Sequence, residues 1–423
     1  MTDLPPSPAI DDLVALFDAA HEPWCEFFEL SPAEHRAWHM TGYLIRDRAR
    51  FDDPQITRTW PADLPPFENG YSIDRQLWLY DQPSEYYRRH LLLHEGVHGV
   101  MNTLLGGAGS PWYMEGVAEL LATHRWNDGR IELAIMPRDR EEVPYLGRIK
   151  LVQDAVAAGR FFPLATLLEV PPSAFRSDEA YAWVWASALF LDRHPQYGPA
   201  FRALHAIVRA PDFTARVRRQ LTDDWALLEA QWQVFASELE HGYDFERAAL
   251  DLSAGRPLGD DSAEVAVAAD RGWQNTGLVL EAGRTYRLSA AGRYQLADRP
   301  RVWWSEPGGV SIRYYRGRPL GQLLAAVWNG EGPLIAGGID AATGSAAQGD
   351  DDHPAAAQDA AAAGAAMFGT APGHGTLVDP WSVGVEATIR PAQSGTLLLR
   401  INDAPAELSD NAGGLSAQIS PLD

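Results

Sequence analysis

Two histidines and a glutamate in one short run have the types and spacing of a metal-dependent hydrolase. The run is His94-Glu95-Gly96-Val97-His98. Histidines four apart lie on the same face of a helix, so both imidazoles can reach one zinc ion, while Glu95 beside them can hold a water molecule bound to that ion. The alternative is a pair of hydrogen-bonded histidines without a metal, because a five-residue pattern also recurs by chance.

A second run, from Trp112 to Glu119, offers the remaining ligand. It follows a turn rich in glycine, serine and proline, so we expect a helix that folds back on the first. Glu115 then falls where a third zinc ligand is needed, and three protein ligands leave the fourth position for water. Glu119, one turn later, can accept a hydrogen bond from the free ring nitrogen of a ligating histidine. The alternative is that Glu119 itself is the third ligand.

These two runs resemble the metal-binding segments of the gluzincin superfamily of zinc peptidases. The similar segments are His94-Glu95-x-x-His98 and Trp112-x-x-Glu115-Gly116-x-Ala118. The resemblance implies a zinc metallopeptidase in which His94, His98 and Glu115 hold the zinc and Glu95 is the general base. No G-x-M-E-N segment, which binds a free amino terminus in gluzincin aminopeptidases, occurs upstream, so we expect an endopeptidase.

The same resemblance assigns roles to two further segments. It implies that Tyr181 stabilises the tetrahedral intermediate, with a plain core aromatic residue as the alternative. It also implies that residues 76–80 form a strand that pairs with extended substrate, with an internal strand that makes no substrate contact as the alternative. The run from Leu221 to Trp232 resembles the closing helix of bacterial peptidase-MA-like proteins.

The elements expected to position these residues are mostly helices. Hydrophobic spacing predicts that residues 84–107 form one amphipathic helix that starts at Ser84 and stops at Gly106 and Gly107. One strand, 71–80, precedes it, and a polar connection, 126–144, follows the second helix. Further helices are expected at 10–29 with a break at Pro23, 145–158, 179–192, 198–208 and 223–241.

The composition changes near residue 250, where long helical periods give way to short alternating segments separated by glycine. This pattern is typical of a β-sandwich. We therefore expect a multidomain α+β protein with a mostly helical gluzincin-type domain at 1–250 and an all-β, jelly-roll-like sandwich at 251–423. A segment rich in alanine, glycine and aspartate at about 338–375 is expected to be a loop insertion. The expected strands are 277–280, 285–290, 381–389, 396–401 and 415–419.

The second half resembles the calcium-dependent galactose-binding bacterial lectins, above all in the segment from Ile401 to Gly413. The resemblance implies a Ca²⁺ site, since its oxygen ligands are those this ion prefers. The alternative is a polar turn without a metal. The sugar-contacting His and Gln of those lectins have no counterparts here, which argues against galactose. Side chains of Asp403, Asp410 and Asn411 and backbone carbonyls of Tyr294 and Glu407 would hold the ion.

Charge and composition exclude several classes of function. The 57 acidic and 35 basic residues give a net charge of −22, which repels nucleic acid and anionic membranes. The sequence contains no run of about 18 apolar residues, so no segment is predicted to insert into a membrane. Without a signal-peptide pattern we expect a cytoplasmic protein, with non-classical export as the alternative because calcium sites suit the cell exterior. The single cysteine, Cys25, forms no internal disulfide.

Two functional hypotheses remain open at this stage. The first is a zinc endopeptidase that cleaves a peptide or protein substrate and carries a carbohydrate- or partner-binding sandwich. The second is a glycan- or protein-binding protein whose helical half is a weakly active or inactive scaffold. Glu95 favours the enzyme, because a site that only bound zinc would have no need of a general base.

Overall fold

The computed structural model describes residues 1–51, 57, 60–61, 64–331, 334 and 371–422. It combines helices with antiparallel and mixed sheets and divides into two compact units. The helical unit contains Met1–Ala249, Glu331 and Pro405–Ser409, and the β unit contains the other described residues from Leu250 onward. Most of the predicted insertion at 338–375 lies outside the described residues.

A three-stranded sheet in the helical unit differs from the single strand expected at 71–80. The chain forms a hairpin there, with β2 (Gly70–Ile73) antiparallel to β3 (Gln76–Tyr80). Asp74 turns the hairpin with a φ of 53°, a conformation that aspartate tolerates better than most residues. β1 (Thr41–Ile45), which was not predicted, runs parallel to β3 and completes the order β1-β3-β2.

Helix α1 (Pro8–Phe27) corrects the break expected at Pro23, because the helix continues through this residue. A proline inside a helix removes one backbone hydrogen bond, so the segment must be held by packing. Ala20, Trp24 and Phe27 flank the proline and are buried. Trp24 reaches the bare backbone of Gly96, where a Cβ atom would lie 2.6 Å from the indole ring.

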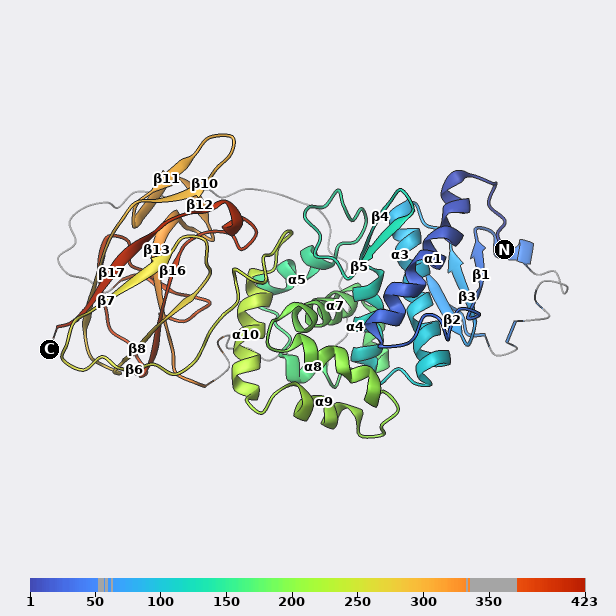
Figure 1. Cartoon of the computed structure of the whole chain (residues 1–423), viewed down its shortest axis with the longest axis horizontal. Helices are drawn as coiled ribbons and strands as arrows, with labels where there is room; N and C mark the ends of the chain where they lie inside the picture. Colours follow the sequence, from blue (N-terminus) through green and yellow to red (C-terminus); the bar gives the residue numbers. More distant parts are fainter. Residues whose placement is uncertain (52–56, 58–59, 62–63, 332–333, 335–370, 423) are drawn as a thin grey trace. The chain divides into compact units, whose positions relative to one another are not determined.

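Helix α3 (Glu85–Val100) carries the histidines and begins as predicted, but the α-helix ends at Val100, before the predicted stop at Gly106 and Gly107. The Ser84 side chain caps its first turn by accepting a hydrogen bond from the Tyr87 N–H. The helix continues as a π-helical turn over Met101–Leu105 and stops at Gly106, whose φ of 70° is left-handed. Helix α4 (Pro111–Ala122) then packs against α3 and against α7 (Asp178–Arg193) (Figure 1).

The polar connection after α4 contains a hairpin that the sequence did not reveal, β4 (His124–Asn127) with β5 (Arg130–Leu133). The predicted run at 198–208 is a short α8 followed by a 3-10 turn, and α9 was not expected. The remaining elements are η1 (Arg48–Phe51), α5 (Arg148–Ala157), α6 (Leu164–Leu167), η3 (Pro172–Arg176), α8 (Gly198–Arg202), η4 (Ala203–Ile207), α9 (Phe213–Leu221) and α10 (Trp225–Glu238).

The β unit has two larger sheets that share one hydrophobic core, so it is a sandwich. One sheet has the order β12-β13-β16-β8-β6, with β14 also paired to β13, and the other has the order β15-β9-β17-β7. Leu280 and Ile401 from the first sheet join Leu288 and Ile419 from the second in the same buried cluster. A separate pair, β10 with β11, completes the unit.

The expected strand at 381–389 is divided between the two sheets, with Gly384 at a φ of 63° between its parts. Strands β7 and β10–β13 were not predicted as strands. The elements are β6 (Arg256–Pro257), β7 (Ala263–Ala268), β8 (Gln274–Leu280), β9 (Tyr286–Ala291), β10 (Tyr294–Ala297), β11 (Trp303–Ser305), β12 (Gly308–Tyr315), β13 (Arg318–Trp328), β14 (Trp381–Ser382), β15 (Glu386–Ile389), β16 (Gly395–Ile401), η5 (Leu408–Asp410) and β17 (Gly414–Pro421).

A search of the described ranges for helices long and apolar enough to cross a bilayer finds none.

Candidate metal centre

Helices α3 and α4 bring the three predicted zinc ligands together. The Nε2 atoms of His94 and His98 lie 3.0 Å apart. Glu115 Oε2 lies 3.2 Å from the Nε2 atom of His94 and 3.5 Å from that of His98. All three side chains are buried. Two helical histidines and one carboxylate therefore direct their ligand atoms to one point.

These separations are close to what a tetrahedral zinc ion requires, although the two distances from His94 Nε2, 3.0 and 3.2 Å, are slightly shorter. Ligand bonds of about 2.0–2.2 Å at tetrahedral angles place neighbouring ligand atoms roughly 3.3–3.6 Å apart. Glu115 Oε2 is buried and has no hydrogen-bond partner among the described residues, which is costly for a carboxylate oxygen without a cation. The donor set of two imidazoles and one carboxylate is typical of catalytic zinc sites, and the residues therefore fit this metal.

The electrostatics of the cluster favour a positive charge at its centre. Burial alone would raise the pKa of Glu115, but the two histidines outweigh it and lower this pKa to about 2. Burial likewise would lower the pKa of His94, yet Glu115 and Glu119 outweigh it and raise this pKa to about 10. A proton or a metal ion can supply the charge.

Glu119 lies behind His94, on the side of the ring away from Glu115. Its Oε1 is 3.2 Å from the Nδ1 atom of His94. Arg148 donates to both carboxylate oxygens, from Nε at 2.8 Å and from Nη2 at 3.2 Å. Burial opposes ionisation of Glu119, but Arg148 and His90 outweigh it and hold its pKa well below the usual range. This placement is the one that a carboxylate orienting a ligating histidine would have, and Glu115 as the third ligand stays a prediction.

His90 precedes His94 by one helical turn and was not singled out from the sequence. With His94 and Glu119 it forms a second group of metal-ligand types. Its Nδ1 lies 3.0 Å from the Ala122 carbonyl and its Nε2 lies 3.4 Å from Glu119 Oε1. Burial lowers the pKa of His90, and Glu119 opposes this shift.

Glu95 is buried beside the cluster and touches the sheet. A Cβ atom at Gly70, the first residue of β2, would lie only 2.8 Å from Glu95 Oε1 and 3.0 Å from a methyl group of Leu79. Glycine at this position therefore lets the strand approach the carboxylate. The spacing of the histidine motif predicted Glu95, whereas nothing local in the sequence indicated Gly70.

Tyr181 comes from α7 and reaches the same cluster. Its ring centroid is 6.2 Å from that of His94, with the two planes at 65°. The guanidinium carbon of Arg148 lies 5.4 Å from the tyrosine ring centroid. Burial and the nearby Glu115, Glu119 and Glu95 carboxylates raise the pKa of Tyr181, so its phenol stays a hydrogen-bond donor. Tyr181 thus lies beside the cluster, while its role in stabilising the intermediate and the alternative of a core aromatic residue both stay predictions.

The expected pairing of residues 76–80 with substrate needs correction. These residues form β3, the central strand, whose two edges pair with β1 and β2. A central strand has no free backbone edge for a peptide. β2 ends the sheet on one side, and within the described residues no further strand pairs with it.

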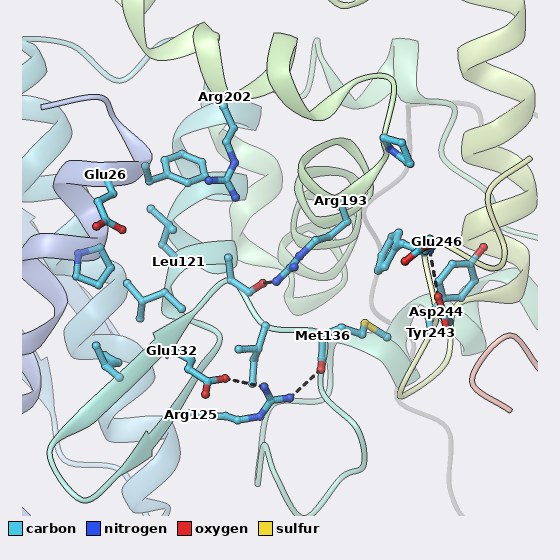
Figure 2. Close-up of a pocket in the computed structure, with 18 residues that line it drawn as sticks. Glu26, Leu121, Arg125, Glu132, Met136, Arg193, Arg202, Tyr243, Asp244 and Glu246 are labelled. Carbon is cyan, nitrogen blue, oxygen red and sulfur yellow. Dashed lines mark hydrogen bonds and ion pairs between the residues drawn. The ribbon is translucent and has the colours of Figure 1, made fainter. Parts of the chain in front are cut away.

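The two large hollows of the helical unit lie away from these residues. One, of about 810 Å³, involves the β4–β5 hairpin (Figure 2). Its arginines already have partners, since Arg125 bonds to Glu132 and Arg202 to Asp192. The other, of about 890 Å³, has an apolar wall between α1 and β1. Neither is lined by a cluster residue, and we assign the chemistry to the cluster because it holds the reactive groups.

In the β unit, two of the proposed calcium ligands contact each other. Asp403 is fully buried, and its Oδ2 accepts a hydrogen bond of 2.9 Å from the Nδ2 of Asn411. The same Nδ2 donates to the Ala269 carbonyl, while Asn411 Oδ1 is buried with no hydrogen-bond partner among the described residues. Buried Arg400 donates to the carbonyl of Asp403. Arg400, three residues before Asp403, thus places a positive charge beside one of the predicted calcium ligands.

The other predicted calcium ligands are placed less directly. Tyr294 is buried and its hydroxyl donates to the Gly321 carbonyl. The next residue, Gln295, pairs with Ala412 and donates from its side chain to the Asp410 carbonyl at 2.8 Å, so residues 294–295 lie beside 410–412. Glu407 lies in Pro405–Ser409, a segment of the helical unit, whereas the other four predicted calcium ligands belong to the β unit.

No protein-family model and no curated protein sequence matches this chain. Among solved structures, it is similar to "EclA N-terminal domain; PllA-like lectin" at 17% identity and a TM-score of 0.22, over 38% of this chain and 94% of that one. It is also similar to the IMPa metallopeptidase in complex with T-antigen, at 9% identity and a TM-score of 0.16, over 77% of this chain and 27% of that one.

A second IMPa structure, from Pseudomonas aeruginosa in complex with an O-glycopeptide, is 11% identical with a TM-score of 0.16, over 77% of this chain and 29% of that one. This chain thus spans less than a third of the length of the IMPa chains. TM-scores of this size do not establish a common fold.

Proposed function

We propose that the helical unit is a zinc-dependent endopeptidase of the gluzincin type. The observation that carries this proposal is the convergence of His94 Nε2, His98 Nε2 and Glu115 Oε2 at mutual distances of 3.0–3.5 Å. A zinc ion held there supplies Lewis acidity, which polarises a peptide carbonyl and lowers the pKa of a water molecule.

The side chains around this point take complementary roles in the proposed reaction. Glu95 accepts the proton of the attacking water and returns it to the leaving amine. Tyr181 donates a hydrogen bond to the carbonyl oxygen as negative charge develops on it. Glu119 holds the Nδ1 proton of His94, which leaves the Nε2 lone pair free for the metal.

For the substrate, we propose an extended peptide that pairs with the free edge of β2. This strand ends the sheet, and Gly70 brings its backbone into contact with Glu95. Backbone pairing at a sheet edge would place a peptide bond beside the general base whatever its side chains are. We thus propose that Gly70–Ile73, and not residues 76–80, pair with the extended substrate.

The competing function is a binding protein with an inactive helical scaffold. The two differ in what Glu95 does, because a binding site needs the zinc ligands but not a proton acceptor. Metal analysis of the purified chain, followed by digestion of a peptide library with the parent and with Glu95→Gln, separates them. We expect one zinc per chain in both and cleavage by the parent alone. Zinc without cleavage in the parent would favour the scaffold.

For the β unit we propose a jelly-roll-like sandwich that binds a glycan or a protein partner, with a calcium ion near Asp403 and Asn411. The pairing of β8 with β16 and of β7 with β17, strands far apart in the chain, supports the jelly-roll type. The buried Asn411 Oδ1, which lacks a hydrogen-bond partner among the described residues, supports the ion site.

A further inference from the structure

We propose that Arg148, the first residue of α5, is a positioning residue that controls both the metal site and Tyr181. The inference rests on the peptidase function proposed above and deepens it. Arg148 makes its ion pair with Glu119 and not with a predicted metal ligand or the general base, and no motif in the sequence marks it. Its side chain nevertheless contacts both Glu119 on α4 and Tyr181 on α7.

The first contact of Arg148 is with the carboxylate behind His94. Nε and Nη2 donate to the two oxygens of Glu119 at 2.8 and 3.2 Å. Two bonds from one planar fork fix the plane of the carboxylate as well as its position. Glu119 Oε1 is then held 3.2 Å from His94 Nδ1, which fixes the ring that directs Nε2 toward Glu115 and His98.

The second contact is with the proposed oxyanion donor. The guanidinium carbon of Arg148 stands 5.4 Å from the ring centroid of Tyr181, within the range of a cation–π interaction. Tyr87 also lies close to Arg148, since the guanidinium opposes the rise in the pKa of the Tyr87 phenol that burial causes. Because Arg148 is only 6% exposed, these contacts are little weakened by solvent.

Arg148 also explains why a second metal ion is not needed at the group formed by His90, His94 and Glu119. A metal there would compete with the guanidinium for both oxygens of Glu119 and would need the Nδ1 atom of a histidine whose Nε2 faces the first site. The guanidinium supplies the positive charge that a buried carboxylate requires. The positive charge beside Glu119 is thus supplied by Arg148, whereas the positive charge beside Glu115 would be supplied by the metal ion.

Lysine at this position would keep the charge but lose the fork and the planar face. We expect Arg148→Lys to weaken zinc binding by about 10-fold or more, as loss of a partner behind a metal ligand usually does. At saturating zinc, kcat should fall about 10-fold or more because Tyr181 is misplaced, while KM changes little. In a Tyr181→Phe background, the effect of Arg148→Lys on kcat should shrink, because the two residues act together.

Arg202 provides a matched control within the same unit. It donates from Nε and Nη2 to both oxygens of the buried Asp192 at 2.7 and 3.2 Å, which is the same fork arrangement. Asp192 lies near the far end of α7 from Tyr181. Arg202→Lys should therefore lower the melting temperature without changing zinc affinity or kcat.

The experiment uses the full chain and measures zinc affinity by chelator competition, kcat and KM on a peptide found in the library digest, and melting temperature. A parent that binds no zinc or cleaves no peptide overturns the proposed function itself. A parent that does both, with Arg148→Lys matching Arg202→Lys in zinc affinity and kcat, overturns only the role of Arg148.

A milder variant keeps the test valid if Arg148→Lys does not fold. Tyr87→Phe removes only the hydroxyl whose pKa Arg148 influences. It should shift zinc affinity and kcat in the same direction by a smaller factor, about two- to five-fold. Parent values of both quantities in a folded Tyr87→Phe protein would contradict the proposal.

Discussion

The two candidate ion sites of this molecule differ in what faces their acidic oxygens. In the helical unit, Glu115 Oε2 faces two imidazole nitrogens that can turn lone pairs toward a common point. In the β unit, the oxygens of Asp403 accept from the Ala404 N–H at 2.8 Å and from the Asn411 amide at 2.9 Å. A cluster of acceptors calls for a cation, whereas acceptors already matched by N–H donors do not.

The counter-charges differ in the same way. Arg148 neutralises Glu119 behind the zinc cluster and leaves Glu115 for the metal. Arg400 lies beside Asp403 itself, in contact with its carbonyl. Calcium binding would require Asn411 to turn its oxygen toward the ion and give up the two bonds made by its Nδ2. We therefore expect a strong effect of zinc and a weaker effect of calcium.

The largest expected effect comes from Glu95→Gln, which keeps the size of the side chain and removes the proton acceptor. Peptide hydrolysis should fall by on the order of 10²–10⁴-fold or more, while zinc content and melting temperature stay at the parent values. Kinetic assays with metal analysis of the same samples check this. Cleavage at the parent rate would show that Glu95 is not the base.

Next in size is Tyr181→Phe, which removes one hydroxyl from the site. Loss of one donor to the developing negative charge should lower kcat by about 10²–10³-fold with little change in KM. Trp185→Phe on the same helix, which removes the indole N–H that donates to the Thr123 hydroxyl, serves as a comparison. A larger effect on kcat from Trp185→Phe than from Tyr181→Phe would indicate that Tyr181 only packs in the core and does not act in the reaction.

A smaller effect is expected from Gly70→Ala. The new Cβ atom would lie 2.8 Å from Glu95 Oε1 and 3.0 Å from Leu79, so the carboxylate must move. We expect kcat/KM to fall about 10-fold or more with zinc retained, because the base is displaced by a fraction of an ångström or more. Gly129→Ala is the control, since a Cβ atom there would meet nothing within 4 Å; its φ of 76° strains an alanine, so this variant should lose stability and keep its activity. Equal activity in the two variants would show that β2 plays no part in the reaction.

The smallest effect concerns the β unit and would sharpen the contrast between the sites. If calcium binds near Asp403, an excess of about 100 times its Kd stabilises the folded state by about 2.7 kcal/mol, which would raise the melting temperature by roughly 5 °C. Magnesium should do less because it demands a tighter shell. Calorimetry of the full chain with each ion, and with Asp403→Asn, measures this. Melting indifferent to calcium and to chelator would leave the loop as a hydrogen-bonded turn.

Local spacing was sufficient to predict that His94 and His98 direct their ring nitrogens to the same place. A helix turns by a fixed angle per residue, so His94 and His98 had to share a face, and the Ser84 cap and Gly106 stop set the ends of α3. The change from helical to alternating patterns near residue 250 likewise reflects the two periods of regular structure. These features depend on neighbours a few residues apart, which is why the sequence shows them.

Packing between segments distant in the chain determined the features that the sequence did not predict. The central place of β3 depends on β1, which lies some thirty residues earlier in the chain, and the approach of β2 to Glu95 depends on a missing side chain at Gly70. Arg148 reaches Glu119 and Tyr181 only because α4, α5 and α7 pack together. Sheet order and the pairing of buried charges arise from contacts between residues far apart in sequence, and no local pattern encodes such contacts.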